Sequence, residues 1–493
     1  MLNEAFDLFA NAAPATVMIR GVLENIVSEN RLNALFDDVA KVQYTRDLTF
    51  ASVVRLMSQV VMRIRPSVNA AYRQQADELE VTAKCVYDKL GGIEPQVFRE
   101  LVRRIARELE VVIRTLGGDL PSPLPGYRLR ILDGNHLAGT DRRLKLLRGC
   151  AGAALPGQAL AVLDPALKMV VDLFPCEDAH TQERAQLDPV LETAEPRDLW
   201  IADRNFCTKR FLFGISRKHA AFLVRQHAGL PWEALEEPVY VGEIKTGRVF
   251  EQRVRVTPDD GKELTLRRIT IQLHEATRDG ETELHLLTNL PREDAAALTV
   301  ASLYSDRWQI ESVFQELTVD LCCEVSTLGY PKAALFAFSV AVLCYNAFSV
   351  TKAALRVGPC DPPPAAMPER SVAASAERPP IQPPRRGADL STYYLADEVA
   401  GTWRGMMVVL PEAFWAEKFA DLTALELADV LKDLAGRAKP GQYRQRPPSR
   451  RASKRKRPCQ PGSHSSTARI LKNGHHKQKC IEAAGATLRA TLP

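Results

Sequence analysis

The sequence lacks the cysteine patterns that mark disulfide-rich secreted proteins and zinc proteins. Its ten cysteines are scattered, none forms a CxxC pair, and no secretory signal precedes them. Both classes need closely spaced or paired cysteines, so neither a disulfide framework nor a zinc site is indicated. We expect reduced thiols in a cytoplasmic compartment.

Long uncharged runs are also scarce. One run is long enough to suggest a membrane span, and it reads AALFAFSVAVLCYNAFSVT, residues 333–351. It stands alone in the chain, is rich in alanine and carries polar residues such as Asn346 and Ser349. A buried helix beneath the functional site is therefore the favoured interpretation, with a single membrane span as the alternative, and no membrane partner is expected.

Acidic residues are missing from one segment near the C-terminus. Residues 439–479 hold 13 Lys and Arg and no Asp or Glu, which leaves 65 − 13 = 52 basic against 60 acidic residues elsewhere, a net charge of −8. Stretches such as RQRPPSRRASKRKRP are typical of a flexible arm that binds a polyanion with an affinity that falls steeply with salt. A disordered solubility tail remains the alternative.

The length of 493 residues predicts two to four domains. Residues 1–125 have helical periodicity, clearest in PQVFRELVRRIARELEVVIRTLGG. Its apolar stripe, stop signal at Gly117 and initial Pro95 predict a helix with one buried face. The stripe consists of Val97, Leu101, Ile105, Leu109, Val112 and Leu116. This region is the expected helical N-terminal DNA-binding domain, in which ELEVTAKCVYDKLGG could form a helix-turn-helix that offers Lys84 and Lys89 to DNA. A plain helical bundle explains the pattern equally well.

The period changes from helix to strand at Tyr127. The short apolar runs YRLRILD, QALAVLD, KMVVDLF, DLWIAD and AAFLVRQ are separated by turn residues, which predicts an α/β core with a mixed sheet over residues 126–357. Residues 237–290 instead read as successive strands joined only by turns, so we expect a β-rich insertion at about 228–295. Helical pattern returns near Arg292.

The C-terminal third divides by composition. Residues 358–387 contain nine prolines, too many for a helix or a central strand, and are expected to form a linker or exposed loop. Residues 388–438 regain helical pattern. The basic tail, residues 439–493, is expected to be disordered.

Two apolar runs end in an aspartate, Asp133 in RILD and Asp203 in LWIAD. A carboxylate at the end of a buried strand is rigid while its oxygens face outward, which suits a hard cation. With Glu311 on a helix, these carboxylates could bind two Mg²⁺ ions about 3.5–4 Å apart, the arrangement used to cut phosphodiesters.

Each acid also has an ordinary structural interpretation. Asp133 could belong to a turn with Gly134, Asp203 could cap a helix, and Glu311 could pair with a basic neighbour. Asp164 and Asp172 also follow apolar runs. The pattern alone therefore does not force the choice of ligands.

The segment YSDRWQIESVFQEL places three chemically active residues at helical spacing. Tyr304, Arg307 and Glu311 stand at i, i+3 and i+7, so on a helix they would share one face. Trp308 lies one residue further round the helix and is expected to pack in the core rather than stack on a base.

Three segments together resemble a known family. LDGNHL, WIADRNF and LLTNLP followed by LYSDRWQIESVFQEL are similar to successive blocks of the DDE transposases of bacterial insertion sequences. The group in question has the signature Tyr, two residues, Arg, three residues, Glu, six residues, Lys. The resemblance covers most of the chain and is weakest in the first hundred residues and the proline-rich stretch. It implies an RNase H-like catalytic core.

The resemblance also implies roles for individual residues. Asp133, Asp203 and Glu311 would be the catalytic residues and the ligands of two Mg²⁺ ions, which Mn²⁺ could replace. Tyr304 and Arg307 would bind DNA phosphate near the cleaved end. The implied partners are double-stranded DNA, as terminal inverted repeats and as target, and a second copy of the chain in a homodimeric paired-end complex. The implied location is the bacterial cytoplasm, at the nucleoid.

The sequence departs from the signature at one position. The lysine should fall at 318, where this chain has Thr318, followed two residues later by Asp320. A threonine brings no charge to a phosphate; Lys332 or the basic tail could compensate. Two alternatives to an active transposase are a decayed DNA-binding descendant and an RNase H-like nuclease that cuts without joining strands.

Overall fold

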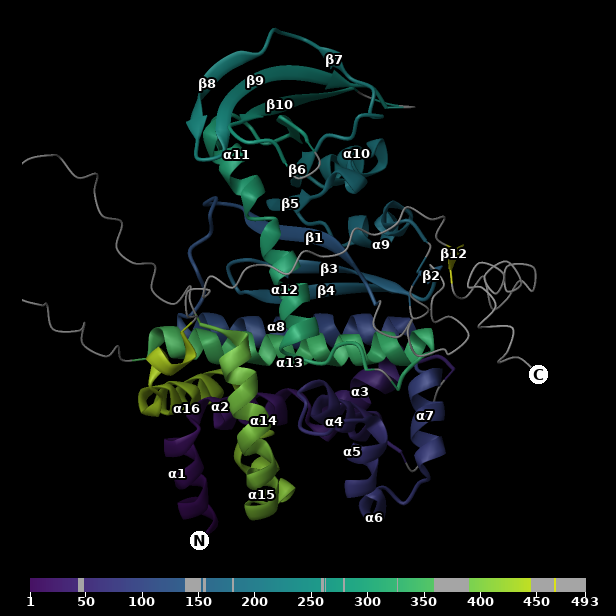
Figure 1. The fold of residues 1–493 in the computed structure, drawn as a ribbon, viewed down its shortest axis with the longest axis vertical. Helices are drawn as coiled ribbons and strands as arrows, with labels where there is room; N and C mark the ends of the chain where they lie inside the picture. Colours follow the sequence, from purple (N-terminus) through teal and green to yellow (C-terminus); the bar gives the residue numbers. More distant parts are fainter. Residues whose placement is uncertain are drawn as a thin grey trace, which may run out of the picture.

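Three layers follow one another along the long axis of the molecule (Figure 1): a β-rich end, a central sheet, and a base of helices. The architecture is mixed α/β. The computed structural model describes residues 1–42, 48–137, 152–153, 157–179, 181–258, 261, 263–277, 280–325, 327–358, 390–444 and 465–466.

The central layer is a mixed sheet in the order β4-β3-β1-β5-β6. Its strands are β1 (Arg128–His136), β3 (Gln158–Asp164), β4 (Met169–Cys176), β5 (Asp198–Ala202) and β6 (Ala221–Arg225). β1 pairs antiparallel with β3 and parallel with β5, and β5 pairs parallel with β6. The expected mixed sheet is thus present, and its two parallel neighbours β1 and β5 end at the same edge.

The β-rich end continues the central sheet and is not a second sheet. Its strands are β7 (Glu233–Ala234), β8 (Val239–Ile244), β9 (Gly247–Val256), β10 (Leu264–Leu273) and β11 (Glu283–Thr288). β11 pairs antiparallel with both β6 and β10. The successive strands expected between residues 237 and 290 are present. A short strand pair outside this sheet joins β2 (Gly152–Ala153) to β12 (Ser465–Ser466).

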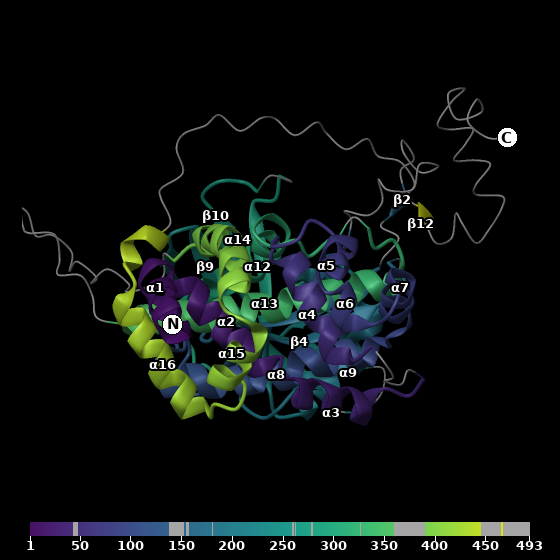
Figure 2. The same cartoon turned by 90° about the horizontal axis from the view of Figure 1, so that it is seen from below.

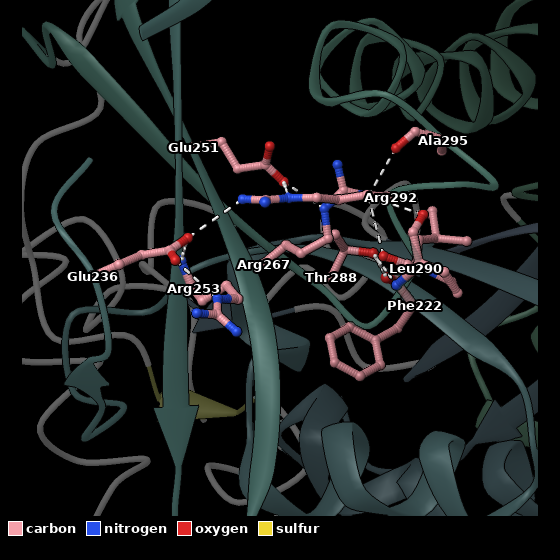
Figure 3. A network of polar contacts seen from close by, with 10 residues as sticks. Phe222, Glu236, Glu251, Arg253, Arg267, Thr288, Leu290, Arg292 and Ala295 are labelled. Atoms are coloured by element: carbon pink, nitrogen blue, oxygen red, sulfur yellow. Dashed lines mark hydrogen bonds and ion pairs between the residues drawn. The ribbon is translucent and has the colours of Figure 1, made fainter. Parts of the chain in front are cut away.

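A buried arginine ties the β-rich end to the segment that leads into the next helices (Figure 3). Arg267 on β10 donates through Nε to Glu251 Oε1 at 2.6 Å and through Nη1 to Leu290 O at 3.1 Å and Ala295 O at 2.8 Å. Arg292 also bonds to Glu251 Oε1, at 3.2 Å. The guanidinium thus satisfies backbone carbonyls of an irregular segment that no strand can pair.

Each face of the sheet packs against a different group of helices. One face packs on α9 (Leu187–Glu192) and α10 (Lys209–Arg217), and the other on α8 (Pro95–Leu116), α12 (Trp308–Val319) and α13 (Pro331–Val357). Two 3₁₀ turns, η2 (Glu183–Gln186) and η3 (Arg204–Phe206), precede α9 and α10. Alternate strand residues face opposite groups, so Ile131 faces the α12 side and Leu132 the α10 side.

Two long helices lie side by side beneath β4, α8 and α13 (Figure 1). The whole predicted stripe of α8 is buried, and Gly117 ends the helix in the left-handed conformation at φ 68°, so that helix prediction is confirmed. α13 is apolar and long enough to cross a membrane, but its apolar stretch is entirely buried in the protein. The expectation of a buried helix is confirmed, and Asn346 on α13 bonds both backbone groups of Val170 on edge strand β4.

The base combines the helices of both ends of the chain, and Figure 2 shows α1, α2 and α14 to α16 gathered on one side with α3 to α7 on the other. Phe6 packs on Trp415, and the Arg20 guanidinium lies between the rings of Trp403 and Trp415. The N-terminal elements are α1 (Leu2–Ala12), α2 (Pro14–Ile26), α3 (Glu29–Val39), α4 (Phe50–Val61), α5 (Val68–Gln74), α6 (Ala76–Leu79) and α7 (Ala83–Gly92). The C-terminal ones are α14 (Thr392–Val409), α15 (Glu412–Phe419), α16 (Ala424–Arg437) and η4 (Pro440–Tyr443).

The helix α7 contains Lys84 and Lys89, the two lysines of the expected helix-turn-helix. Lys89 is buried, and its Nζ lies 4.5 Å from the ring centroid of Phe36, so it cannot present its charge to DNA in this arrangement. Burial lowers the pKa of Lys89 below its ordinary value. Lys84 is exposed. For Lys89 the bundle interpretation is therefore the correct one. The proline-rich segment and the tail beyond residue 444 lie outside the described residues, apart from β12.

Candidate active site

The two aspartates stand at matching positions on neighbouring parallel strands. Ile131 pairs with Ile201 and Leu132 with Ala202, the last pair between β1 and β5, and Asp133 and Asp203 follow directly after it. Ile131 and Ile201 face the α12 side, and strand alternation turns residues 133 and 203 to that same side. Their placement follows from the register of two buried strands, which is a rigid support.

Each aspartate uses one oxygen locally. Asp133 Oδ1 accepts from the backbone N–H of Gly134 at 2.9 Å, and Asp203 Oδ1 caps η3 by accepting from Arg204 N at 2.6 Å. The capping expected for Asp203 is therefore present, but it engages a single oxygen. Among the described residues, Asp203 Oδ2 has no hydrogen bond and can accept a ligand.

Glu311 enters the site from α12, which crosses the sheet on this face (Figure 1). The expected single helix is two: α11 (Ala297–Ser305) ends before Asp306, and α12 begins at Trp308. Asp306 and Arg307 keep right-handed helical backbone angles through the break. The helical spacing of Tyr304, Arg307 and Glu311 is therefore kept across the break, and Tyr304 interacts with Arg307.

Arg307 joins two of the three acids. Its Nη1 donates to Asp133 Oδ2 at 2.9 Å and its Nη2 to Glu311 Oε1 at 2.8 Å. Within the part of the chain that the structure describes, its Nε is buried without a hydrogen-bond partner. A guanidinium that holds two carboxylates in this way fixes their spacing, because its donors form a rigid planar fork.

Tyr304 and Arg307 are both buried here, each with 7% of its surface exposed. Burial raises the pKa of the Tyr304 hydroxyl well above its ordinary value, so it remains a neutral donor. The expectation that Trp308 packs in the core is wrong: it is 60% exposed, with the Arg307 guanidinium 5.1 Å from its ring centroid. The aromatic residue turned outward at this site is thus Trp308.

The acids crowd one another. Burial raises the pKa of Asp133 to about 6; Arg307 and the Gly134 amide act to lower it, while Glu183 and Asp203 raise it further. Glu183 lies against the backbone at Gly134, where a Cβ atom would collide with its carboxylate. Glu183 is a fourth acid that the sequence analysis did not identify, and the only local signal was a glycine beside Asp133.

The donor set fits a divalent cation. Three carboxylates supply the hard oxygen ligands that Mg²⁺ prefers, and the raised pKa of Asp133 shows that Arg307 does not fully offset the cost of burying its charge. Within the described ranges, no three His, Cys, Asp or Glu side chains yet stand close enough to hold a metal. Arg307 is the cation placed between Asp133 and Glu311.

A cavity of about 470 Å³ opens near the end of β1, and its lining includes Glu183 but none of the three predicted acids. It is lined by His136, the residue at the end of β1, by Glu183, and by Arg184, Arg204 and His227 together with neighbouring polar side chains. The two arginines of this cavity are groups that can bind an anion, and Arg204 already pairs with Glu281 at 3.5 Å.

Thr318 lies exposed near the far end of α12. Its hydroxyl donates to Phe314 O at 2.9 Å, one turn back along the helix. It therefore brings no charge to this part of the surface, as the sequence indicated.

The comparisons with known proteins agree with this arrangement. Residues 125–347 match the family model described as the transposase DDE domain, a range that runs from just before β1 into α13 and contains all three acids. No curated protein matches the chain. The mixed α/β sheet is consistent with an RNase H-like transposase domain. Residues 125–347 are thus similar to the DDE domains of transposases, a family associated with transposition and DNA recombination.

Proposed function

We propose that this protein is the transposase of a bacterial insertion sequence, hydrolysing a phosphodiester at each end of the element and then joining the freed 3′-hydroxyl to target DNA. The observation that carries the proposal is the convergence of Asp133 and Asp203, in register on adjacent parallel strands, with Glu311 held by the same guanidinium as Asp133.

Asp133, Asp203 and Glu311 would hold two Mg²⁺ ions. Bound there, such ions supply Lewis-acid activation of the attacking hydroxyl and stabilisation of the leaving oxygen. The protein contributes rigid ligand placement, from two buried strands and one packed helix, so no nucleophilic side chain is required.

Arg307 is proposed to have two tasks. It fixes the spacing of Asp133 and Glu311, and its unpartnered Nε is a donor that a phosphate oxygen could satisfy. Tyr304 is neutral and interacts with Arg307, and it would help to orient the guanidinium. Because both residues are buried, their contact with DNA would be limited to the phosphate that enters the site.

The proposed partners are the terminal inverted repeats, the target duplex and a second copy of the chain. Strand joining at two ends requires two active sites, which a homodimer on paired ends provides. The basic tail of residues 439–493 would reach DNA outside the catalytic core.

The proposal is tested by cleavage of a duplex that carries the element's own terminal sequence. Wild type is compared with Glu311→Gln, which keeps the shape of the side chain and removes its charge, in the presence and absence of Mg²⁺. The matched control is Glu293→Gln, at an exposed acid just before α11. Cuts that need Mg²⁺, survive in Glu293→Gln and vanish in Glu311→Gln support the proposal.

Thr318 favours one competing function, a descendant that binds DNA without cutting it. Wild-type binding with no cut under any metal, and no rescue by Thr318→Lys, would establish that alternative. Cutting without insertion of the 3′ end into a second duplex would instead identify a nuclease.

A further inference from the structure

Arg63 occupies an unusual backbone position at the end of α4. It is the second residue after the helix, and its φ is 59°, the left-handed conformation that glycine adopts most readily there. Its N–H donates to Val60 O at 3.0 Å, as in a helix C-terminal turn. Four other non-glycine residues among those described also have positive φ, so the conformation by itself only directs attention to what the Arg63 side chain contacts.

The side chain of Arg63 reaches the C-terminal end of α12. Its Nη2 donates to Val319 O at 2.6 Å and to Leu321 O at 3.3 Å, carbonyls that the helix leaves without an internal partner. The same two elements meet through the backbone, where Cys322 N donates to Val61 O at 2.7 Å. Arg63 is exposed, so its guanidinium lies at the surface.

The outer face of α12 forms a continuous exposed stripe that starts at the active site and ends at Arg63. Its exposed members Trp308, Ser312, Gln315 and Val319 are spaced at i, i+4, i+7 and i+11. At about 1.5 Å per residue the stripe is roughly 16 Å long. That is about five nucleotides along one DNA strand, at about 3.4 Å each.

This stripe carries no positive charge of its own. α12 contains neither Lys nor Arg from residue 308 to residue 319, and Thr318 is bonded back to its own helix. Arg307 at the near end is occupied by two carboxylates. Among the described residues, Lys168 bonds Gln309 near the start of α12 but is half-buried, whereas Arg63 at the far end of the helix is exposed.

We propose that Arg63 is a phosphate-binding residue that replaces, from a different helix, the cation missing at position 318. The proposal rests on the proposed function, since it requires that DNA follow α12. Within the described part of the chain Arg63 makes no ion pair closer than 4 Å, so Nε and Nη1 can bind phosphate while Nη2 stays on the carbonyls. Arg63 also interacts electrostatically with Asp320. The two hydrogen bonds to carbonyls hold the guanidinium in place before DNA binds.

The experiment measures binding of the full-length protein to a generic linear duplex by fluorescence anisotropy over a range of NaCl concentrations. Arg63→Gly suits the left-handed backbone and removes the charge. Arg63→Gln keeps an amide donor for the carbonyls without charge, and Arg63→Lys keeps the charge. The double variant Arg63→Gly with Thr318→Lys returns a cation at the other position.

We expect Arg63→Gly and Arg63→Gln to reduce the slope of log K against log[salt] by about one, the loss of one phosphate contact. Arg63→Lys should keep the wild-type slope, and Thr318→Lys should restore it in the Gly variant. An unchanged slope in both Gly and Gln variants overturns the proposal and leaves Arg63 as a helix cap.

The proposed function can fail separately. If wild type binds and cuts DNA but the slope of log K against log[salt] is the same in the Arg63 variants, only this inference is overturned. If wild type binds no DNA at all, the inference and the proposed function are rejected together.

Discussion

At the residue scale, the candidate site sets three carboxylates around one guanidinium. Arg307 lies between Asp133 and Glu311, while burial and the neighbouring acids keep the pKa of Asp133 near 6. The site is thus short of positive charge as it stands. Cation binding is what such a site favours.

Metal binding should stabilise the folded protein without any DNA. A ligand that binds only the folded state adds about 2.7 kcal/mol at 100 times its Kd. We expect Mg²⁺ to raise the Tm of wild type and to leave the Tm of Asp203→Asn unchanged, in a thermal scan with and without chelator. An equal rise in both proteins would show that the ions bind elsewhere.

A second residue-scale prediction concerns Asp320, at the end of α12. Burial and the nearby Glu316 raise its pKa to about 6, against the lowering effect of Lys352 and Arg63. A carboxyl whose pKa is higher in the folded than in the unfolded protein costs stability when it is ionised. This cost is absent below about pH 4, near the unfolded pKa, and complete above about pH 6, near the folded pKa. Asp320 is only partly buried, so solvent screening reduces this cost, and Asp320→Asn should stabilise the protein by about 1–2 kcal/mol at pH 8, a gain that fades as the pH falls from about 6 to about 4.

Urea unfolding at pH 8 and at pH 4.5 measures this difference. Asp429→Asn, at an exposed position on α16, is the control and should change little at either pH. A gain for Asp320→Asn that is the same at both pH values would contradict the assigned cause.

At the element scale, the sequence predicted strands and helices where their periodicity was strong. The stripe of α8 and the buried α13 followed from spacing and apolarity alone, because one-sided burial leaves its period in the sequence. The alignment of Asp133 with Asp203 could not be predicted from spacing and apolarity, since strand register depends on pairing between segments about 70 residues apart. The break between α11 and α12 also left no signal, as Asp306 and Arg307 are ordinary helical residues.

Exposure of individual side chains was the other failure at this scale. Trp308 is large and apolar, which favours the core, but the buried face of α12 is taken by Ile310, Val313 and Leu317. The tryptophan lies on the opposite side. Glu183 was missed because its proximity to Asp133 arises only when η2 folds over the end of β1.

The Arg267 network gives an element-scale prediction for the β-rich end (Figure 3). Removing one partner of a buried ion pair leaves the other charge unpaired, at a cost of about 3–5 kcal/mol. Arg267→Met should therefore destabilise the protein by up to about that much in urea unfolding, because Glu251 stays buried with only the more exposed Arg292, at 3.2 Å, as its partner. The double change with Glu251→Gln should recover part of the loss.

The neighbouring pair of Arg253 and Glu236 serves as the control. Arg253 is more than half exposed, so Arg253→Met should cost under about 1 kcal/mol. Equal losses for Arg267→Met and Arg253→Met would show that burial is not what makes the Arg267 pair important.

At the scale of the whole molecule, both ends of the chain build the helical base, and Tyr443, just after the last long helix, packs into it. Tyr443 is 1% exposed, its hydroxyl bonds Glu398 Oε2 at 2.5 Å, and its carbonyl accepts from Ser391 N at 2.8 Å. The described part of the helical base therefore includes residues up to Arg444. The charge of the chain changes sign beyond that point.

Truncation tests what the tail contributes. Residues 445–493 hold 12 basic residues and one acidic residue, so removing them takes the net charge from +5 to 5 − 11 = −6. With Tyr443 kept, the shortened protein should unfold at the wild-type urea midpoint, yet bind a duplex more weakly and with a flatter salt dependence, because fewer counterions are released. Removing residues 439–493 instead deletes Tyr443 and should also lower the midpoint. An unchanged salt slope after removal of 445–493 would mean that the tail does not bind DNA, and that the phosphate contacts lie on the folded core around α12.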